Sequence, residues 1–186
     1  VTGIDLTPEY VAVARELSAW TGLADQIDVE VGSALDSGAD DAAFDRAVQV
    51  HVGMDIADKR ALFAEIHRVL RPGGWFAVYD IMRAAPGDVS FPVPWASDAS
   101  MSHLESTGTS RDALEAAGFD VTAVADRGDV AREFFGRLAG SSAGGPPPLG
   151  LHLVMGDDAP VKIANMVAAV GAGTLAPTEI IARKPA

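Results

Sequence analysis

The sequence predicts an α/β fold, with a mostly parallel β-sheet and helices on both of its faces. Short apolar segments with strand-like patterns alternate with segments in which apolar residues recur at helical spacing. Residues 75–81 are almost continuously apolar, which is typical of a strand buried on both faces. Glycine and proline mark the ends of several of these elements.

A short strand and an amphipathic helix are predicted first. Residues 1–6 are mainly apolar, and Thr7-Pro8-Glu9 then provides a hydroxyl for the N-cap, a proline in the first turn and an acid. We expect the Thr7 hydroxyl to cap the helix and Gly22 to end it. One apolar helical face, which we expect to pack on the sheet, is formed by Tyr10, Val13, Leu17 and Trp20.

Two more strands, a helix and a central strand follow. A strand is predicted over 27–31, where valines alternate with acids, and another over 46–50, after Phe44-Asp45. The next helix should pack through one face and end at Arg71-Pro72-Gly73-Gly74, because proline cannot continue a helix. That face consists of Leu62, Ile66, Val69 and Leu70.

The second half is less regular. We expect a long connection over 83–108, since loops of that length are often functional. The elements predicted after it are a helix at 109–117, a strand at 119–125, helices near 130–138 and 160–170, and a strand at 176–183. The glycines of 140–148 lack the strand–helix context of a phosphate loop and indicate a linker. We therefore expect one domain over residues 1–186, with a helical insertion at about 128–172.

Composition excludes several classes of function. The net charge is −12, and no Lys/Arg cluster is present, so nucleic acid and anionic membranes are poor partners. The acidity is compatible with a cationic small substrate or simply with solubility. There is no cysteine, which rules out disulfides, thiolate zinc sites and thiol catalysis within these residues and fits a cytoplasmic protein.

Three landmarks resemble a known family. Gly3-Ile4-Asp5-Leu6-Thr7-Pro8 is followed by Phe44-Asp45 before a strand, and then by Val69-Leu70-Arg71-Pro72-Gly73-Gly74 before another strand. In this order and at these separations, they resemble the Rossmann-like core of class I S-adenosylmethionine (SAM)-dependent methyltransferases. Gln49-Val50-His51 and Phe91-Pro92-Val93-Pro94-Trp95 are further similar to sarcosine/dimethylglycine methyltransferases.

The resemblance also implies a missing part. The family's first strand and its glycine-rich turn, which approaches the methionine part of SAM, would precede Val1. We therefore expect the sequence to be a fragment of a longer protein; the alternative is a shortened, non-catalytic relative.

Asp5 is the leading cofactor-binding candidate. An acid at the end of a strand in a doubly wound sheet can accept both hydroxyls of a ribose, and the resemblance implies that role toward SAM. A helix-capping or solvated carboxylate is the alternative. Leu6 would lie against the adenine or simply join the core. By resemblance, Ser33 stands where the family often has an acid that contacts the adenine amino group, with Asp36 a few residues later. The backbone groups of Ala34 and Leu35 are further candidates.

The acceptor side is expected beyond the strand at 46–50. By resemblance, backbone near Gln49 flanks the sulfonium and His51 faces the substrate, where it could deprotonate or orient an acceptor. A histidine hydrogen-bonded to backbone is the alternative. Trp95, with Phe91 and Met101, could form an aromatic wall for a methylated ammonium, or it could anchor its loop to the core.

The sequence thus predicts SAM-dependent methyl transfer to a nitrogen or oxygen of a small molecule. A nicotinamide oxidoreductase is less favoured, because no Tyr-x-x-x-Lys pair is present and the two tyrosines, Tyr10 and Tyr79, lie in a helix face and a strand. A non-catalytic binding protein is the third possibility. No metal site is predicted, and the other histidines, His67, His103 and His152, are expected to be structural or solvated.

Overall fold

The computed structural model describes residues 1–141, 149–150 and 152–186. Most of the predicted linker at 140–148 therefore lies outside the described residues. The elements in order are β1 (Thr2–Asp5), α1 (Pro8–Trp20), β2 (Asp28–Val31), β3 (Phe44–Val50), α2 (Lys59–Val69), β4 (Leu70–Arg83), α3 (Thr107–Ala116), β5 (Asp120–Asp126), α4 (Gly128–Ser141), α5 (His152–Met155), α6 (Ala159–Gly171) and β6 (Leu175–Arg183), with 3₁₀ turns at Gly53–Asp55 and Ala99–Met101.

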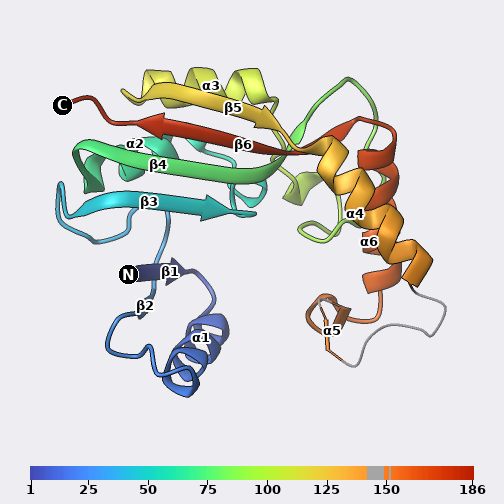
Figure 1. The fold of residues 1–186 in the computed structure, drawn as a ribbon, viewed down its shortest axis with the longest axis horizontal. Helices are drawn as coiled ribbons and strands as arrows, with labels where there is room; N and C mark the ends of the chain where they lie inside the picture. Colours follow the sequence, from blue (N-terminus) through green and yellow to red (C-terminus); the bar gives the residue numbers. More distant parts are fainter. Residues whose placement is uncertain (142–148, 151) are drawn as a thin grey trace.

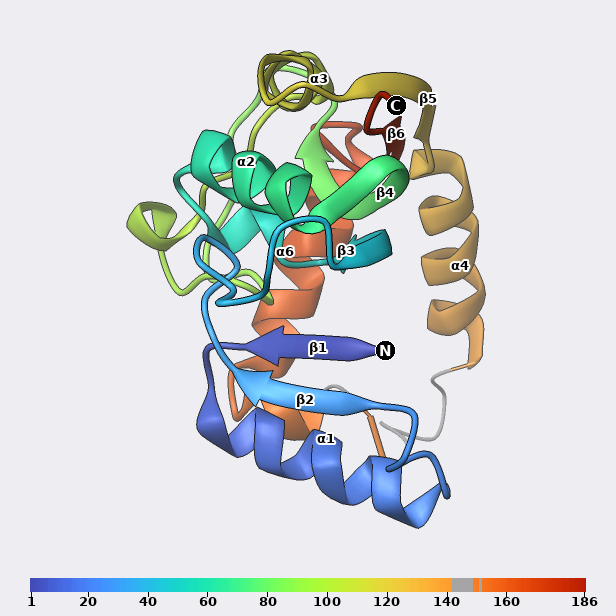
Figure 2. The ribbon, with the colours of Figure 1, turned by 90° about the vertical axis from the view of Figure 1, so that its left-hand side faces the viewer.

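The described strands form two separate sheets. β1 and β2 pair in parallel, and the second sheet has the order β3-β4-β6-β5. β3 and β4 are parallel, whereas β6 runs antiparallel to both β4 and β5. The predicted mostly parallel α/β fold is confirmed, with β6 as the reversed strand. Figures 1 and 2 both place β1 between β2 and β3, and Figure 1 shows β1 and β3 pointing the same way across a gap.

The main core lies between the second sheet and the helices α2 and α3. Its buried side chains come from α2, β4, α3 and β6, and include Leu62, Phe63, Phe76, Val78, Leu114 and Ile180. Edge-on contacts between Phe63 and Phe76 add to the packing. On the opposite face of β3 and β4, Val48 is 73% exposed and Trp75 is 41% exposed. A hollow of about 330 Å³ opens there, lined by residues that include Val48, Trp75, Ala77 and Ile181.

The predicted packing face of α1 is wrong. Val11 and Ser18 are the buried residues of this helix, whereas Tyr10, Val13, Leu17 and Trp20 are each at least half exposed. The helix meets β2 on the neighbouring face, where Arg15 Nε donates to the Val29 carbonyl at 2.7 Å. The spacing of apolar residues correctly predicted a helix, but it did not predict which face of that helix packs against β2.

Two other local predictions need correction. Thr7 is the N-cap residue of α1, but its side chain accepts no capping hydrogen bond. The α3 helix begins two residues earlier than expected and is capped by Ser106, whose Oγ accepts the Thr109 N–H. β4 begins at Leu70, directly after α2, and so is longer than the predicted segment 75–81. Pro72 and Gly73 lie at an irregularity in this strand, where the register of β3 and β4 shifts between the pairs Phe44–Leu70 and Arg46–Trp75.

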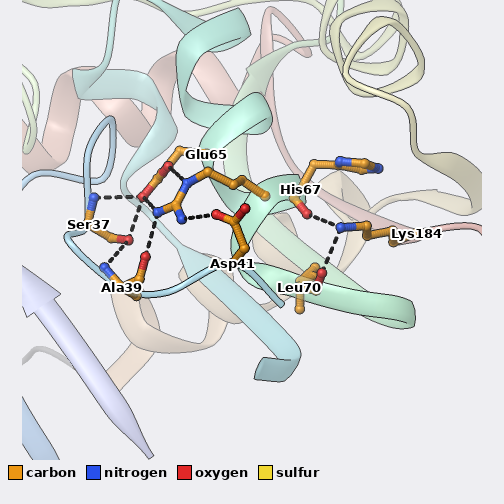
Figure 3. Close-up of polar contacts among 8 residues, drawn as sticks. Ser37, Ala39, Asp41, Glu65, His67, Leu70 and Lys184 are labelled. Carbon is orange, nitrogen blue, oxygen red and sulfur yellow. Dashed lines mark hydrogen bonds and ion pairs between the residues drawn. The ribbon is translucent and has the colours of Figure 1, made fainter. Parts of the chain in front are cut away.

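Polar contacts around α2 hold the loop 32–43 and the C-terminal end in place (Figure 3). Glu65 accepts hydrogen bonds from the Ser37 backbone N–H at 2.7 Å and from the Arg68 guanidinium at 2.8 Å. Arg68 also pairs with Asp41 at 2.6 Å. At the same C-terminal end of the helix, Lys184 Nζ donates to the carbonyls of His67 and Leu70, both at 2.8 Å. Among the described helices, none has the length and apolarity that a membrane span requires.

Candidate cofactor and acceptor site

Asp5 ends β1 beside Val31 of β2, and its side chain is exposed. Its Oδ1 accepts the Thr7 backbone N–H at 2.8 Å, and its backbone carbonyl accepts the Gly32 N–H at 3.0 Å. The carboxylate therefore holds the N-cap residue of α1 through its N–H, and the capping bond expected of the Thr7 hydroxyl is not formed. Its second oxygen, Oδ2, has no partner among the described residues and can accept a hydroxyl. Leu6 beside it is 71% exposed, so in this structure it is not part of the core.

The loop after β2 starts at the same carboxyl edge, since β1 and β2 are parallel (Figure 2). The Ser33 hydroxyl accepts the Leu35 N–H at 3.1 Å, and the Asp36 N–H donates to the Ser33 carbonyl at 3.1 Å. Ser33 thus closes a tight turn. Ala34 packs against the main core and Leu35 is 40% exposed. In this turn Leu35 faces solvent, whereas Ala34 packs against the core.

Gln49, near the end of β3, is buried, at 7% exposure, and its side chain points toward the core rather than the gap between the sheets. Its Nε2 donates to Asp80 Oδ2 at 2.5 Å. Its Oε1 is the one described side-chain atom that is buried without a hydrogen-bond partner. A cavity of about 10 Å³ next to it has room for roughly one water molecule. Any contact of Gln49 with a cofactor would therefore have to be made by its backbone.

His51 follows β3 with a left-handed backbone, at φ 52°. Its backbone N–H donates to the Tyr79 carbonyl at 2.9 Å, and its ring meets the Tyr79 ring edge-on at 5.3 Å between centroids. The residue is exposed, and no side-chain hydrogen bond holds its imidazole among the described residues. The hydrogen bond between His51 and the backbone is thus made by its own N–H, and its imidazole makes none among the described residues.

A group of titratable residues lies next to this turn. Burial, together with the nearby Asp80, raises the pKa of Asp55 to about 6. Burial also lowers the pKa of Lys59, against the opposing effect of Glu105. Lys59 Nζ donates to the carbonyls of Ile56 and His103, the latter at 2.8 Å, and so ties the turn to the long connection.

The long connection between β4 and α3 closes over the same end of the sheet. Trp95 is partly buried against a second core cluster that includes Met54 and Ile81. Its indole Nε1 donates to Ser102 Oγ at 3.0 Å. These contacts favour the anchoring role for Trp95 over an open aromatic wall, whereas Met101 is 51% exposed.

Three functional candidates were missed in the sequence: Asp80, Asp55 and Lys59. A signal for Asp80 was present, because an acid within an otherwise apolar strand must find hydrogen-bond partners when buried. His103, which was expected to be structural or solvated, lies beside Lys59, and its backbone carbonyl accepts the Lys59 hydrogen bond. Among the described residues, no three His, Asp or Glu side chains gather in a way that could hold a metal ion.

Comparison with known proteins identifies a family match and several relatives. The profile of a family described as a methyltransferase domain matches residues 1–78. The O-methyltransferase cnsE of Penicillium expansum is 31% identical over 126 residues, which are 68% of this chain and 46% of that protein. The chain spans about 36% and 46% of the first two curated relatives.

Solved structures show the same fold. A protein of Galdieria sulphuraria assigned as a sarcosine dimethylglycine methyltransferase superposes with a TM-score of 0.77 at 23% identity, over 99% of this chain and 69% of that one. A geranyl diphosphate methyltransferase in complex with SAM superposes with a TM-score of 0.76 at 16% identity, over 99% of this chain and 68% of that one. Residues 1–78 match the methyltransferase-domain family, and the chain as a whole has the fold of SAM-dependent methyltransferases. These matches favour a methyltransferase over the nicotinamide oxidoreductase and the non-catalytic alternatives.

Proposed function

We propose that this protein transfers a methyl group from SAM to a nitrogen or oxygen atom of a small molecule. The observation that carries the proposal is the position of Asp5 at the carboxyl end of a parallel strand, with one carboxylate oxygen unpartnered and exposed. A carboxylate at this place suits the two hydroxyls of an adenosine ribose. The exposed Leu6 beside it offers an apolar surface to an adenine ring.

The topology supports a ligand site at the same edge. β1 and β3 lie on either side of the gap between the sheets (Figure 1). The strand that follows each of them, β2 after β1 and β4 after β3, lies farther from the gap, so the two connections run in opposite directions. Such a reversal defines a topological switch point, and ligands of α/β sheets bind outside the carboxyl ends of the strands there. The loops that carry Asp5, Ser33 and His51 all leave their strands at this edge.

SAM, when bound, supplies a methyl group on a positively charged sulfur. The protein's own contribution is positioning and the exclusion of water, because direct displacement needs a collinear arrangement more than an acid–base pair. Asp5 would hold the ribose, and the turn at Ser33–Leu35 would border the adenine. The unrestrained imidazole of His51 would orient an acceptor hydroxyl or amine, or take its proton near neutral pH.

We also propose that a further parallel strand completes this domain between β1 and β3. Both strands have unpaired edges at the gap, and they point the same way. Exposed β-edges of this kind are normally covered. The crossover from such a strand to β1 and the crossover from β1 to β2 run in the same direction across the sheet. If both are right-handed, the helix of the first lies on the same side of the sheet as α1. That side is the bare face of β3, where Val48 is 73% exposed.

Calorimetric titration with SAM, with NAD as the comparison ligand, tests the proposal. The chain and a longer form that includes upstream residues should be titrated in parallel. We expect the longer form to bind SAM and not NAD, and the 186 residues alone to bind more weakly. Binding of NAD in place of SAM by the longer form would contradict the proposed function. Equal SAM affinity of the two forms would contradict the completing strand.

We also propose a cytoplasmic location for the protein, and the lack of cysteine in these residues supports it.

A further inference from the structure

A buried carboxylate lies beneath the turn that carries His51. Asp80 is 3% exposed, on the face of β4 that packs against α2. It accepts three hydrogen bonds: from the Val52 N–H at 2.9 Å, from the Gly53 N–H at 3.1 Å and from Gln49 Nε2 at 2.5 Å. Two of the three donors are therefore the first two backbone amides after His51.

These bonds account for the conformation of the turn. His51 has φ 52°, a left-handed conformation that non-glycine residues adopt rarely and at a cost. Its own N–H is held by the Tyr79 carbonyl at 2.9 Å, and the next two amides are held by Asp80. With the backbone fixed on both sides of its Cα, His51 cannot relax to a right-handed or extended conformation without breaking buried hydrogen bonds.

Gly53 fits the same arrangement. A Cβ atom at this position would overlap the Asp80 carboxylate and lie 2.6 Å from Gln49 Nε2. The absence of a side chain lets the Gly53 amide approach the carboxylate closely. Any side chain there would push the turn away from Asp80.

We propose that Asp80 is a positioning residue, which holds the turn at 51–53 so that His51 faces the acceptor side of the site. The part of this inference that concerns the acceptor rests on the proposed function. Asp80 itself touches no ligand in this account, since it is buried beneath the turn. Its effect passes through the amides of Val52 and Gly53.

Amide hydrogen exchange of the 186-residue chain, read by NMR, tests the positioning directly. In Asp80→Asn, we expect the Val52 and Gly53 amides to exchange about tenfold faster or more, because the acceptor loses its charge. The short intraresidue HN–Hα contact of a left-handed His51 should weaken as well. Asp120→Asn, the same change at an exposed strand position, should leave both signals as they are.

Gly53→Ala gives a second route that does not remove the buried acid. It should produce the same local change in exchange and in the His51 contact. Gly136→Ala, at a site where an added Cβ meets nothing within 4 Å, is its matched control. Gln49→Met removes only the third donor and should leave the Val52 and Gly53 amides protected. If Asp80→Asn does not fold, unchanged exchange in Gly53→Ala overturns the proposal by itself.

Kinetics of a longer, SAM-binding form separate positioning from general damage. Asp80→Asn should raise the KM for the acceptor or lower kcat by about tenfold or more while the Kd for SAM changes less than about twofold. An equal loss of SAM affinity, or faster exchange throughout β3 and β4, would mean that Asp80 is only structural. A longer form that transfers no methyl group would count against the proposed function, and amide exchange alone would then decide whether Asp80 positions the turn.

Discussion

Asp5 and Thr7 are joined at the carboxyl end of β1, where Asp5 Oδ1 accepts the Thr7 N–H at 2.8 Å. This bond orients the carboxylate and leaves Oδ2 for a ligand. It also means that Asp5 has a structural role at the start of α1, which a test of its cofactor role must separate.

Asp5→Ala should weaken SAM binding to a longer form of the protein by at least about 1 kcal/mol, because a charge-assisted contact to the ribose is lost. Calorimetry measures this as a rise in Kd of roughly fivefold or more. Asp28→Ala removes the same charge from the opposite end of the neighbouring strand and should have little effect. Unchanged affinity in Asp5→Ala would remove Asp5 from the cofactor site.

His51→Ala should reduce turnover more than SAM affinity, because the imidazole is expected to act on the acceptor. His51→Asn is a useful companion variant, since asparagine tolerates the left-handed backbone better than alanine does. Steady-state kinetics and SAM titration of both variants provide the measurement. A matched loss of turnover and affinity in both would indicate structural damage instead.

Glu65→Gln should destabilise the protein at neutral pH by about 1–3 kcal/mol, because Glu65 accepts bonds from Ser37 and Arg68. The Arg68 guanidinium, more than any other group, lowers the pKa of Glu65 to about 2. A pKa below that of the unfolded chain adds stability that is present above about pH 4.5 and is lost as the pH falls toward 2. Denaturant unfolding should therefore show the two proteins converging in acid; a difference independent of pH would contradict this.

Asp55→Asn should have the opposite pH dependence. Because the folded protein raises the pKa of Asp55 to about 6 from 3.8, the wild type loses stability as the pH rises through that interval. Asparagine cannot ionise, so the variant should melt at a higher temperature than the wild type at pH 8 and at the same temperature near pH 4. Thermal unfolding at the two pH values provides the measurement. A variant that is less stable at pH 8 would show that the carboxylate makes a favourable contact there.

The sequence was informative where the signals are local. The strand–helix order, the end of α1 before Gly22 and the position of Asp5 at a strand end all depend on residues close together in the chain. The face of α1 was not predictable, because it depends on how the helix meets β2 through Val11 and Ser18.

The role of Asp80 was hidden for a similar reason. Its backbone partners, Val52 and Gly53, lie 28 and 27 residues earlier in the chain. Only the folded sheet brings them together, since β3 and β4 pair in parallel and their carboxyl ends meet. Trp95 shows the converse: an aromatic residue in a long loop fits either a pocket wall or an anchor, and only its contacts with Ser102 and the core distinguish the two.

The most direct measurement is a crystal structure of the longer form with S-adenosylhomocysteine. The account predicts the ribose hydroxyls on the carboxylate of Asp5, with the ligand extending past Ser33 toward the turn at His51. A ligand bound elsewhere, with Asp5 facing only solvent and Thr7, would contradict it.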